Sequence, residues 1–370
     1  MAARQTSFKQ QKFFSSLWVN GILILICLIW TIPTLGVLIT SFRNSEDIFR
    51  SGWWTVFPHM AWEGTREIKI DPAVDVNGPM TVEGITATYE QFRMGVEAPD
   101  HSKKFTWYGN KRSRLIKVSE QQWKGFDIRL TWDNYTNVLS GKAIRYKDAE
   151  GQEIVRQGRD LSGAFLNSVA VAVPSTIIPI LIAAFAAYGF AWLNFPGRKF
   201  IFSIVVALLV VPLQIALVPI LQDYTNLNLN GTFLAIWMAH TGFGLPLAIY
   251  LLFNYIGNLP RDLFESAFID GASNYTIFTQ LILPLSVPAL ASFAIFQFLW
   301  VWNDYLVALV FLGNETPVVT SALASLVGEK GQDWHLLTSG AFVSMILPLT
   351  VFFVLQRYFV RGLLAGSVKG

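Results

Sequence analysis

Six apolar runs of membrane-spanning length constrain the fold of this chain more than any other feature. A helix needs about 20 predominantly apolar residues to cross a hydrocarbon layer of ~30 Å. The runs lie at about 17–41, 164–188, 200–222, 231–256, 285–312 and 338–359. With 53% hydrophobic and only 14% charged residues, the chain is more apolar than an average globular protein. The sequence therefore predicts an all-α polytopic membrane protein with six transmembrane helices.

The first apolar run is predicted to stay in the membrane as an anchor. It is too long for a removed signal peptide and lacks a small-residue cleavage site. The only cysteine, Cys27, lies inside this run, so the chain can form no internal disulfide.

Lysine and arginine gather in the connections on one side of the predicted spans. On that side the basic residues are Arg4, Lys9, Lys12, Arg198, Lys199, Arg261, Arg357, Arg361 and Lys369. The short connections 223–230 and 313–337 on the other side carry only Lys330. Because short cytoplasmic loops are enriched in Lys and Arg, both termini and residues 260–284 are predicted to be cytoplasmic.

A long polar stretch, 44–160, separates the first two spans and is predicted to be extracytoplasmic. It is rich in tryptophan, which disordered linkers are not. Alternating runs at 65–70 and 125–130 predict strands, and Asn77-Gly78 predicts a hairpin turn. We expect a β-rich insertion that either contacts a substrate-binding protein, covers the outer mouth, or has a structural role only. The chain then divides into 1–43, 44–160 and a core of 161–370.

Residues 260–284 form a polar stretch between two apolar runs. Helical patterns at about 262–270 and 273–281 meet at Gly271, where a residue without a Cβ can take a left-handed turn. Glu265 and Asp270 give this stretch an acidic surface. Its apolar surface is predicted to consist of Phe264, Ala267, Phe268, Ile277, Phe278 and Leu281. Pro284 is expected to open the next membrane helix. The alternative is an ordinary connecting loop with a helix-capping glycine.

The stretch resembles the "EAA" loop of ABC importer permeases, within a docking loop taken as 257–284. Residues that carry the resemblance are Glu265, Ala267, Asp270, Gly271 and Ala272, with Pro284 further on. In that family the loop docks onto a separate ATP-hydrolysing subunit. The resemblance implies that Glu265, Asp270 and Gly271 contact this subunit. Ser266 departs from the pattern, because the family usually has alanine there.

Most of the chain is similar to the carbohydrate branch of this family, the maltose-type second permease. The matching segments are 30–36, 41–43, 130–135, 165–169, 186–191, 195–198, 302–305 and 356–370. The extra sequence is mainly 59–128, and the long first external loop with 51–54 looks most like alpha-glucoside permeases.

The resemblance implies a multi-chain sugar importer in a bacterial plasma membrane. An extracytoplasmic binding protein would deliver the sugar, a second similar permease would complete the path, and two copies of an ATPase would drive alternating access. ATP and Mg would bind the ATPase, so this chain is expected to need no cofactor of its own.

The chain itself lacks the residue patterns of an enzyme. A phosphate-binding loop needs Gly-Lys followed by Ser or Thr, whereas Gly141-Lys142 is followed by Ala143. His59, His101, His240 and His335 are scattered without metal-ligand spacing, so no metal site is expected. No basic patch with interleaved aromatics points to nucleic acid.

Polar and aromatic residues inside the apolar runs are candidates for the sugar path. Those chosen are Asn167, Gln214, Trp300, Trp302, Asn303 and Asp304, with His240 and Gln297 as further polar groups. Such residues face a bundle interior or a wet cavity, or they simply bond to a neighbouring helix. Rival readings are an ion-coupled secondary transporter, an ABC importer for a non-sugar solute, and a membrane-anchored sensor.

Overall fold

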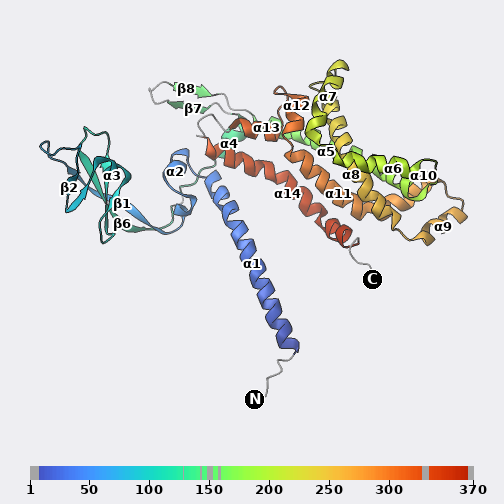
Figure 1. Ribbon diagram of the computed structural model, residues 1–370, viewed down its shortest axis with the longest axis horizontal. Helices are drawn as coiled ribbons and strands as arrows, with labels where there is room; N and C mark the ends of the chain where they lie inside the picture. Colours follow the sequence, from blue (N-terminus) through green and yellow to red (C-terminus); the bar gives the residue numbers. More distant parts are fainter. Residues whose placement is uncertain are drawn as a thin grey trace, which may run out of the picture. The chain divides into compact units, whose positions relative to one another are not determined.

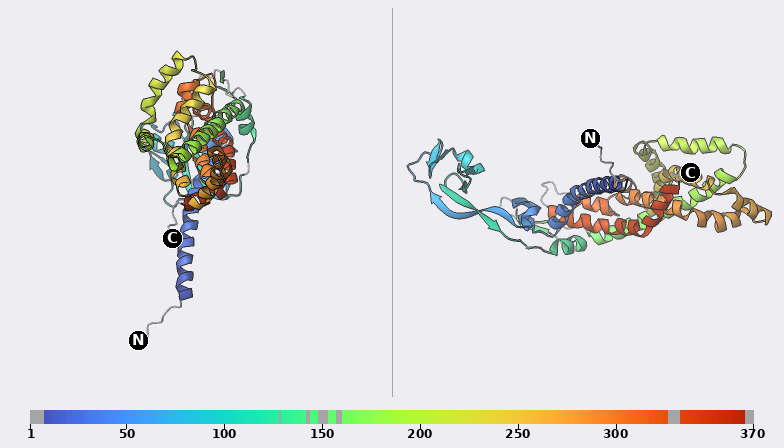
Figure 2. Two further views of the ribbon diagram at one scale, coloured as in Figure 1. Left: turned by 90° about the vertical axis from the view of Figure 1, so that its right-hand side faces the viewer. Right: turned by 90° about the horizontal axis from the view of Figure 1, so that it is seen from below.

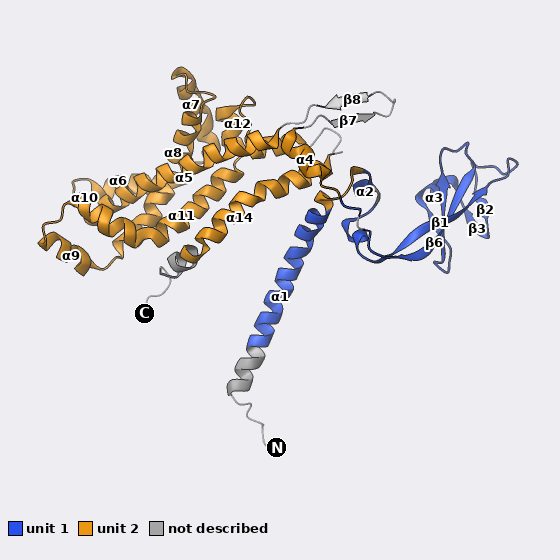
Figure 3. Cartoon of the chain, turned by 180° about the vertical axis from the view of Figure 1, so that it is seen from behind, with its two compact units in different colours: residues 1–39, 46–130 blue, residues 40–45, 131–370 orange. Residues whose placement is uncertain are grey.

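The computed structural model describes residues 8–127, 129–141, 144–147, 153–156, 160–326 and 333–365. The chain forms two compact units, coloured separately in Figure 3. Unit 1 comprises residues 1–39 and 46–130, and unit 2 comprises residues 40–45 and 131–370. Arg4, Lys330 and the C-terminal segment 366–370, which entered the topology and family predictions, lie outside the described residues.

Unit 2 is helical. Its long helices are α5 (Leu161–Trp192), α8 (Phe233–Gly257), α11 (Leu283–Asn303) and α14 (Trp334–Ala365), which pack lengthwise in Figures 1 and 2. The shorter ones are α4 (Asp133–Ser140), α6 (Arg198–Ala207), η2 (Leu208–Val210), α7 (Leu213–Asn226), α9 (Arg261–Ile269), α10 (Asn274–Ile277), the π-helical turn η3 (Phe278–Ile282), α12 (Leu306–Leu312) and α13 (Val319–Leu326). A hairpin of β7 (Ile144–Lys147) and β8 (Glu153–Arg156), within the stretch 44–160 that was predicted to be β-rich, precedes α5.

The prediction of six apolar spans is confirmed when a bent pair is counted as one. Within the described residues, the straight spans are Ser16–Ser41, Leu161–Trp192, Phe233–Gly257, Asn274–Asn303 and Trp334–Tyr358. The sixth joins Arg198–Val210 to Leu213–Asn226 across a bend of 104°. The predicted run over 200–222 is therefore present as a sharply bent helix pair, with the bend at Pro212. Pro212 disfavours the helical conformation of the preceding residue, and Val211 is extended (φ −71°, ψ 117°).

The predicted fifth span, 285–312, was wrong at both ends. Its helix already begins at Asn274, and it ends at Asn303 because Asp304 is extended (φ −73°, ψ 128°). The carboxylate of Asp304 accepts a hydrogen bond from the amide of Ala308 (3.2 Å). Asp304 thus ends one helix and satisfies an otherwise free amide in the first turn of α12.

Two apolar cores lie at different levels of unit 2. The docking-side core surrounds residues 260–284 and includes Ala187, Ile256, Phe264, Ile277 and Phe293. The remote core includes Ala172, Ala239, Phe298, Trp302 and Phe311. Both draw residues from α5, α8 and α11, so these three helices form the frame of the bundle.

Unit 1 contains the first span and the predicted β-rich lobe. Its helices are α1 (Phe8–Ser41, whose last two residues belong to unit 2), α2 (Ser45–Arg50, which starts at the boundary), η1 (Trp53–Val56) and α3 (Tyr89–Met94). The strands are β1 (His59–Lys69), β2 (Met80–Val82), β3 (Ile85–Ala87), β4 (Val96–Glu97), β5 (Lys103–Tyr108) and β6 (Leu115–Lys124). An antiparallel sheet in the order β1-β6-β5-β4 packs around Phe92, Phe105 and Ile116, which are buried.

Two local predictions in the lobe were wrong. The tight hairpin turn lies at Glu83-Gly84 between β2 and β3, and not at Asn77-Gly78. Both turn residues have positive φ (50° and 83°), which two-residue hairpin turns of the favoured type require. Residues 125–127, predicted as part of a strand, are irregular, whereas the strand predicted at 65–70 is present over 65–69 as the end of β1.

Candidate functional site: the 260–284 loop and the polar groups of the bundle

The predicted left-handed turn at Gly271 is present and closes α9 in a complete C-terminal motif. Gly271 has φ +73°. Its amide donates to the carbonyl of Phe268 (3.1 Å), and the amide of Ala272 donates to the carbonyl of Ala267 (3.0 Å). These two bonds define a Schellman motif, in which the left-handed residue is usually glycine. Ser273 then caps α10 by accepting from the amide of Thr276 (3.1 Å), so neither helix end is loose.

Aromatic contacts anchor the loop to the bundle. The ring of Phe264, which is fully buried, lies 4.1 Å from that of Trp192 at the end of α5. The indole of Trp192 also donates to the carbonyl of Ile256 in α8 (3.1 Å). In addition, the hydroxyl of Tyr188 donates to Asn274 Oδ1 (3.1 Å) at the start of α10. Displacement of the loop therefore acts directly on α5 and α8.

The predicted apolar face of the loop packs against the bundle, except at Phe268. Phe264, Ile277 and Phe278 lie in the docking-side core. The exposed surface of the loop carries Phe268 at 48% exposed, Ile269 at 85% and Tyr275 at 73%. Sequence reasoning missed Ile269 although helical spacing could have found it, because residues four apart lie on the same helix face and Glu265 precedes it by four.

The candidate docking residues fall into two groups. Glu265, Asp270 and Gly271 are exposed, and the two carboxylates form no hydrogen bond or ion pair with any residue that the structure describes. Ala267 and Ala272 are half-buried and pack against the docking-side core. The first group is available to a partner, while the second holds the turn against the bundle.

The second helix of the loop continues into the membrane span. It was predicted to end near 281, with Pro284 opening a new helix, but α10, η3 and α11 run on without a break. Pro284 removes one helical N–H, and the chain adopts a π-helical turn immediately before it. Because the backbone is helical from Asn274 to Asn303, a displacement of the loop would move α11 with it.

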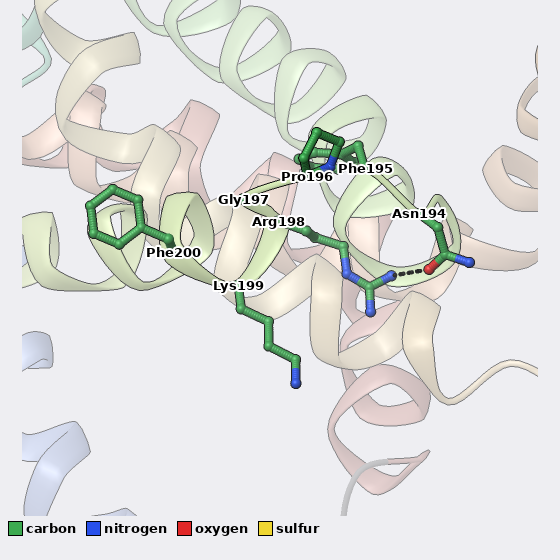
Figure 4. Close-up of a pocket in the computed structure, with 7 residues that line it drawn as sticks. All are labelled: Asn194, Phe195, Pro196, Gly197, Arg198, Lys199 and Phe200. Carbon is green, nitrogen blue, oxygen red and sulfur yellow. Dashed lines mark hydrogen bonds between the residues drawn. The ribbon is translucent and has the colours of Figure 1, made fainter.

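A basic turn between α5 and α6 borders an open hollow lined by residues 194–200 (Figure 4). Arg198 donates to the carbonyl of Leu193 (2.9 Å) and to Asn194 Oδ1 (3.3 Å), which holds its guanidinium against the end of α5. Lys199 extends away from this pair in Figure 4 and is exposed. The hollow is a surface feature of the turn that carries the predicted cytoplasmic charges.

Four of the six candidate path residues do not share a common contact: three donate hydrogen bonds to separate backbone carbonyls, and one is exposed. Asn167 donates to the carbonyl of Pro317 (2.9 Å), and Trp302 donates to the carbonyl of Ser344 (3.0 Å). Asn303 donates to the carbonyl of Leu299 in its own helix (2.8 Å). Gln214 is exposed in the first turn of α7.

The other two, Trp300 and Asp304, meet at His240. The imidazole of His240 is fully buried, with Nε2 3.8 Å from Asp304 Oδ2. The ring of Trp300 meets it edge-on with centroids 5.2 Å apart. This grouping joins α8 to the end of α11 across 60 residues of sequence, which no local pattern could reveal.

Comparison with known proteins places the chain among transport components. The family described as "Binding-protein-dependent transport system inner membrane component" matches residues 171–364. The osmoprotective compounds uptake permease protein GgtD of Synechocystis sp. is 46% identical over 98% of this chain and 95% of its own length. The alpha-glucoside transport system permease protein AglG of Rhizobium meliloti is 46% identical over 94% of this chain and 95% of its own. A probable ABC transporter permease protein of Pyrococcus horikoshii is 41% identical over 55% of this chain and 74% of its own.

Proposed function

Because the chain belongs to the family of binding-protein-dependent transport system inner membrane components, we propose that it carries a sugar across the membrane as one permease of an ATP-driven importer. It is a multi-pass inner-membrane protein and a transport subunit, not an enzyme. The observation that carries the proposal is the 260–284 loop, whose two helix ends are capped, which is anchored to two spans and which is exposed on its acidic side.

The loop is suited to transmit force. Only a binding energy that differs between two states can shift a conformational equilibrium. An ATPase that has closed on ATP would bind the loop in a different position from an open ATPase. The contacts of Trp192 and Tyr188 with the loop would transmit that displacement to α5. Glu265 would pair with a basic group of the ATPase, while Ile269 would fill an apolar pocket beside it. Asp270 and Gly271 would fix the orientation of that face.

The proposed assembly contains further chains. Two copies of an ATP-binding subunit, which hold ATP and Mg, would serve this chain and a second, similar permease. An extracytoplasmic binding protein would deliver the sugar. Both termini and the 260–284 loop would lie in the cytoplasm, because Arg198, Lys199 and Arg261 lie at the same side of the spans.

The substrate class is proposed to be a neutral alpha-glucoside. The names of the two relatives that match nearly the whole chain mention alpha-glucosides and osmoprotective compounds. Uptake by the assembled complex in liposomes would separate these classes: labelled sucrose or maltose represents the first and labelled glycine betaine a non-sugar osmoprotectant. Import of glycine betaine alone would favour the non-sugar importer, and import that follows an ion gradient without ATP would favour a secondary transporter.

Charge reversal at Glu265 tests the docking site. The chain would be purified from its native membrane in mild detergent, and the chains that accompany it would be identified by mass spectrometry. Glu265→Lys is compared with Glu315→Lys, which makes the same change at an exposed glutamate in the connection between α12 and α13. We expect the native chain and Glu315→Lys to retain an ATPase and a second permease, and Glu265→Lys to lose the ATPase alone.

Two results would contradict the proposal. A native chain that is purified without any ATP-binding protein would remove the importer assignment. Equal ATPase retention by Glu265→Lys and Glu315→Lys would leave the importer intact but would exclude Glu265 from the contact.

A further inference from the structure

A polar layer separates the two apolar cores of unit 2. It consists of Ser175 in α5, His240 and Thr241 in α8, and Gln297 in α11. On each helix these residues lie between a stretch that packs in the remote core and one that packs in the docking-side core. The layer is therefore at an intermediate depth of the bundle, where three long helices meet.

The layer contains buried polar atoms without partners. Ser175 and His240 are both fully buried. Within the described ranges, the hydroxyls of Ser175 and Thr241 and both ring nitrogens of His240 form no hydrogen bond. Such groups are rare in proteins and are costly at membrane depth, where no bulk water can satisfy them. A cluster of them on facing helices presents several donors and acceptors that a hydroxyl-bearing ligand can satisfy.

Gln297 and Gly244 show that the layer is a packed, specific arrangement. The amide nitrogen of Gln297 donates to the carbonyl of Ser175 (3.1 Å) and approaches that of His240 (3.5 Å). A Cβ at Gly244 would lie 2.6 Å from the amide atoms of Gln297, so any residue other than glycine would displace the Gln297 side chain. Gln297 thus ties α5 to α8 and fixes the spacing of the unpartnered groups.

One side of the layer leads toward the end of α11. Asp304 Oδ2 is 3.8 Å from His240 Nε2, which is too long for a hydrogen bond. Trp300 beside it is 37% exposed and offers an aromatic ring next to these polar atoms. Polar groups with an adjacent aromatic ring match the hydroxyls and the C–H faces of a sugar.

We propose that this polar layer is a sugar-binding subsite that is closed in the present conformation. The inference rests on the proposed function and names the residues by which this chain holds the substrate. A neutral imidazole has one donor and one acceptor, and a hydroxyl can act as either, so the layer can match sugar hydroxyls in both roles. Separation of α8 from α11 opens the layer, which lies at the intermediate depth where many transporters bind substrate.

A pair of serine substitutions tests the subsite. Ser175→Ala removes an unpartnered hydroxyl from the layer, and Ser286→Ala removes an equally buried, unpartnered hydroxyl from the part of α11 near the docking loop. Uptake of labelled sucrose and maltose is measured with the reconstituted complex. For Ser175→Ala we expect a roughly 2- to 10-fold rise in KM, the effect of one lost hydrogen bond, with the ATP-saturated ATPase rate unchanged. Ser286→Ala should match the native complex.

Thiol labelling tests whether the layer opens. The chain has one cysteine, so Thr241→Cys in a Cys27→Ser background gives a single reporter in this subunit. A small maleimide is added to the complex with and without ATP and binding protein, and Ser286→Cys is the control. We expect the Thr241→Cys thiol to react in only one of the two conditions and sugar to slow that reaction, whereas Ser286→Cys stays unreactive in both.

The outcomes separate this inference from the proposed function. If the native complex imports neither sugar, the proposed function fails and the subsite falls with it. If the native complex imports sugar but Ser175→Ala behaves like Ser286→Ala, or the Thr241→Cys thiol never reacts, the layer is a structural polar contact that buried water satisfies, and only the inference is overturned.

Discussion

Gly271→Ala isolates the contribution of the loop's backbone conformation. A left-handed conformation costs a residue with a Cβ roughly 1–2 kcal/mol, whereas glycine adopts it freely. Gly271 has φ +73°, and a Cβ built there would meet no heavy atom within 4 Å. The substitution therefore adds backbone strain without a steric clash. We expect the population of the ordered turn to fall by roughly 5- to 30-fold relative to its opened forms.

Two measurements report this change. Hydrogen exchange at the amide of Ala272, which is bonded to the carbonyl of Ala267 (3.0 Å), should accelerate by about the same factor. Affinity of the purified permease pair for its ATPase should fall, because a partner must then restore the turn before it can bind.

Gly231→Ala is the matched control for this prediction. Gly231 has φ +79° and equally open surroundings, but it lies in the connection before α8, away from the docking loop. The same strain there should leave ATPase affinity unchanged. Equal losses in both variants would mean that general destabilisation, and not the turn, weakens docking. No loss in either variant would show that the loop does not need its left-handed turn to bind.

Three further perturbations each test a single side chain. Phe264→Ala should lower the free energy of unfolding of unit 2 by about 3–5 kcal/mol in thermal unfolding, because it empties a fully buried site. Phe268→Ala, at a half-exposed side chain, should lower it far less. Similar losses in the two variants would contradict the burial argument. Ser266→Ala should stabilise α9 by a few tenths of a kcal/mol and leave ATPase binding intact, since alanine is the better helix former; weaker ATPase binding would instead assign the hydroxyl a role in docking. A hydrogen bond from the Arg129 side chain lowers the pKa of Asp127 to about 2, so this pair should stabilise the lobe above about pH 4 and lose its effect as pH falls toward 2. Because both side chains are exposed, solvent screens the pair and the effect should be small, and Asp127→Asn should remove that pH dependence from the lobe's tryptophan fluorescence.

Local chemistry explains what could be predicted from the sequence. The six spans follow from apolar length, because only a helix satisfies its own backbone groups inside a membrane. Gly271 was predictable as the turn because two helical patterns meet at this residue, which has no Cβ and can adopt a left-handed conformation at low cost. The lobe was predictable as β-rich from its alternation and its tryptophans, but its register was not, since the hairpin turn lies at Glu83-Gly84 instead of Asn77-Gly78.

Tertiary packing decided which side chains became available for function. Phe264 is buried because Trp192, 72 positions earlier in the chain, lies against it, and Ile269 is exposed because no described residue of unit 2 covers it. The polar layer exists only because α5, α8 and α11 bring Ser175, His240 and Gln297 to one level. The length of an apolar run and the chemistry of a turn depend on residues that are neighbours in the sequence, so the sequence by itself determines both. Burial, pairing and the lack of a partner are properties of residues far apart in the chain, and only the packed bundle decides them.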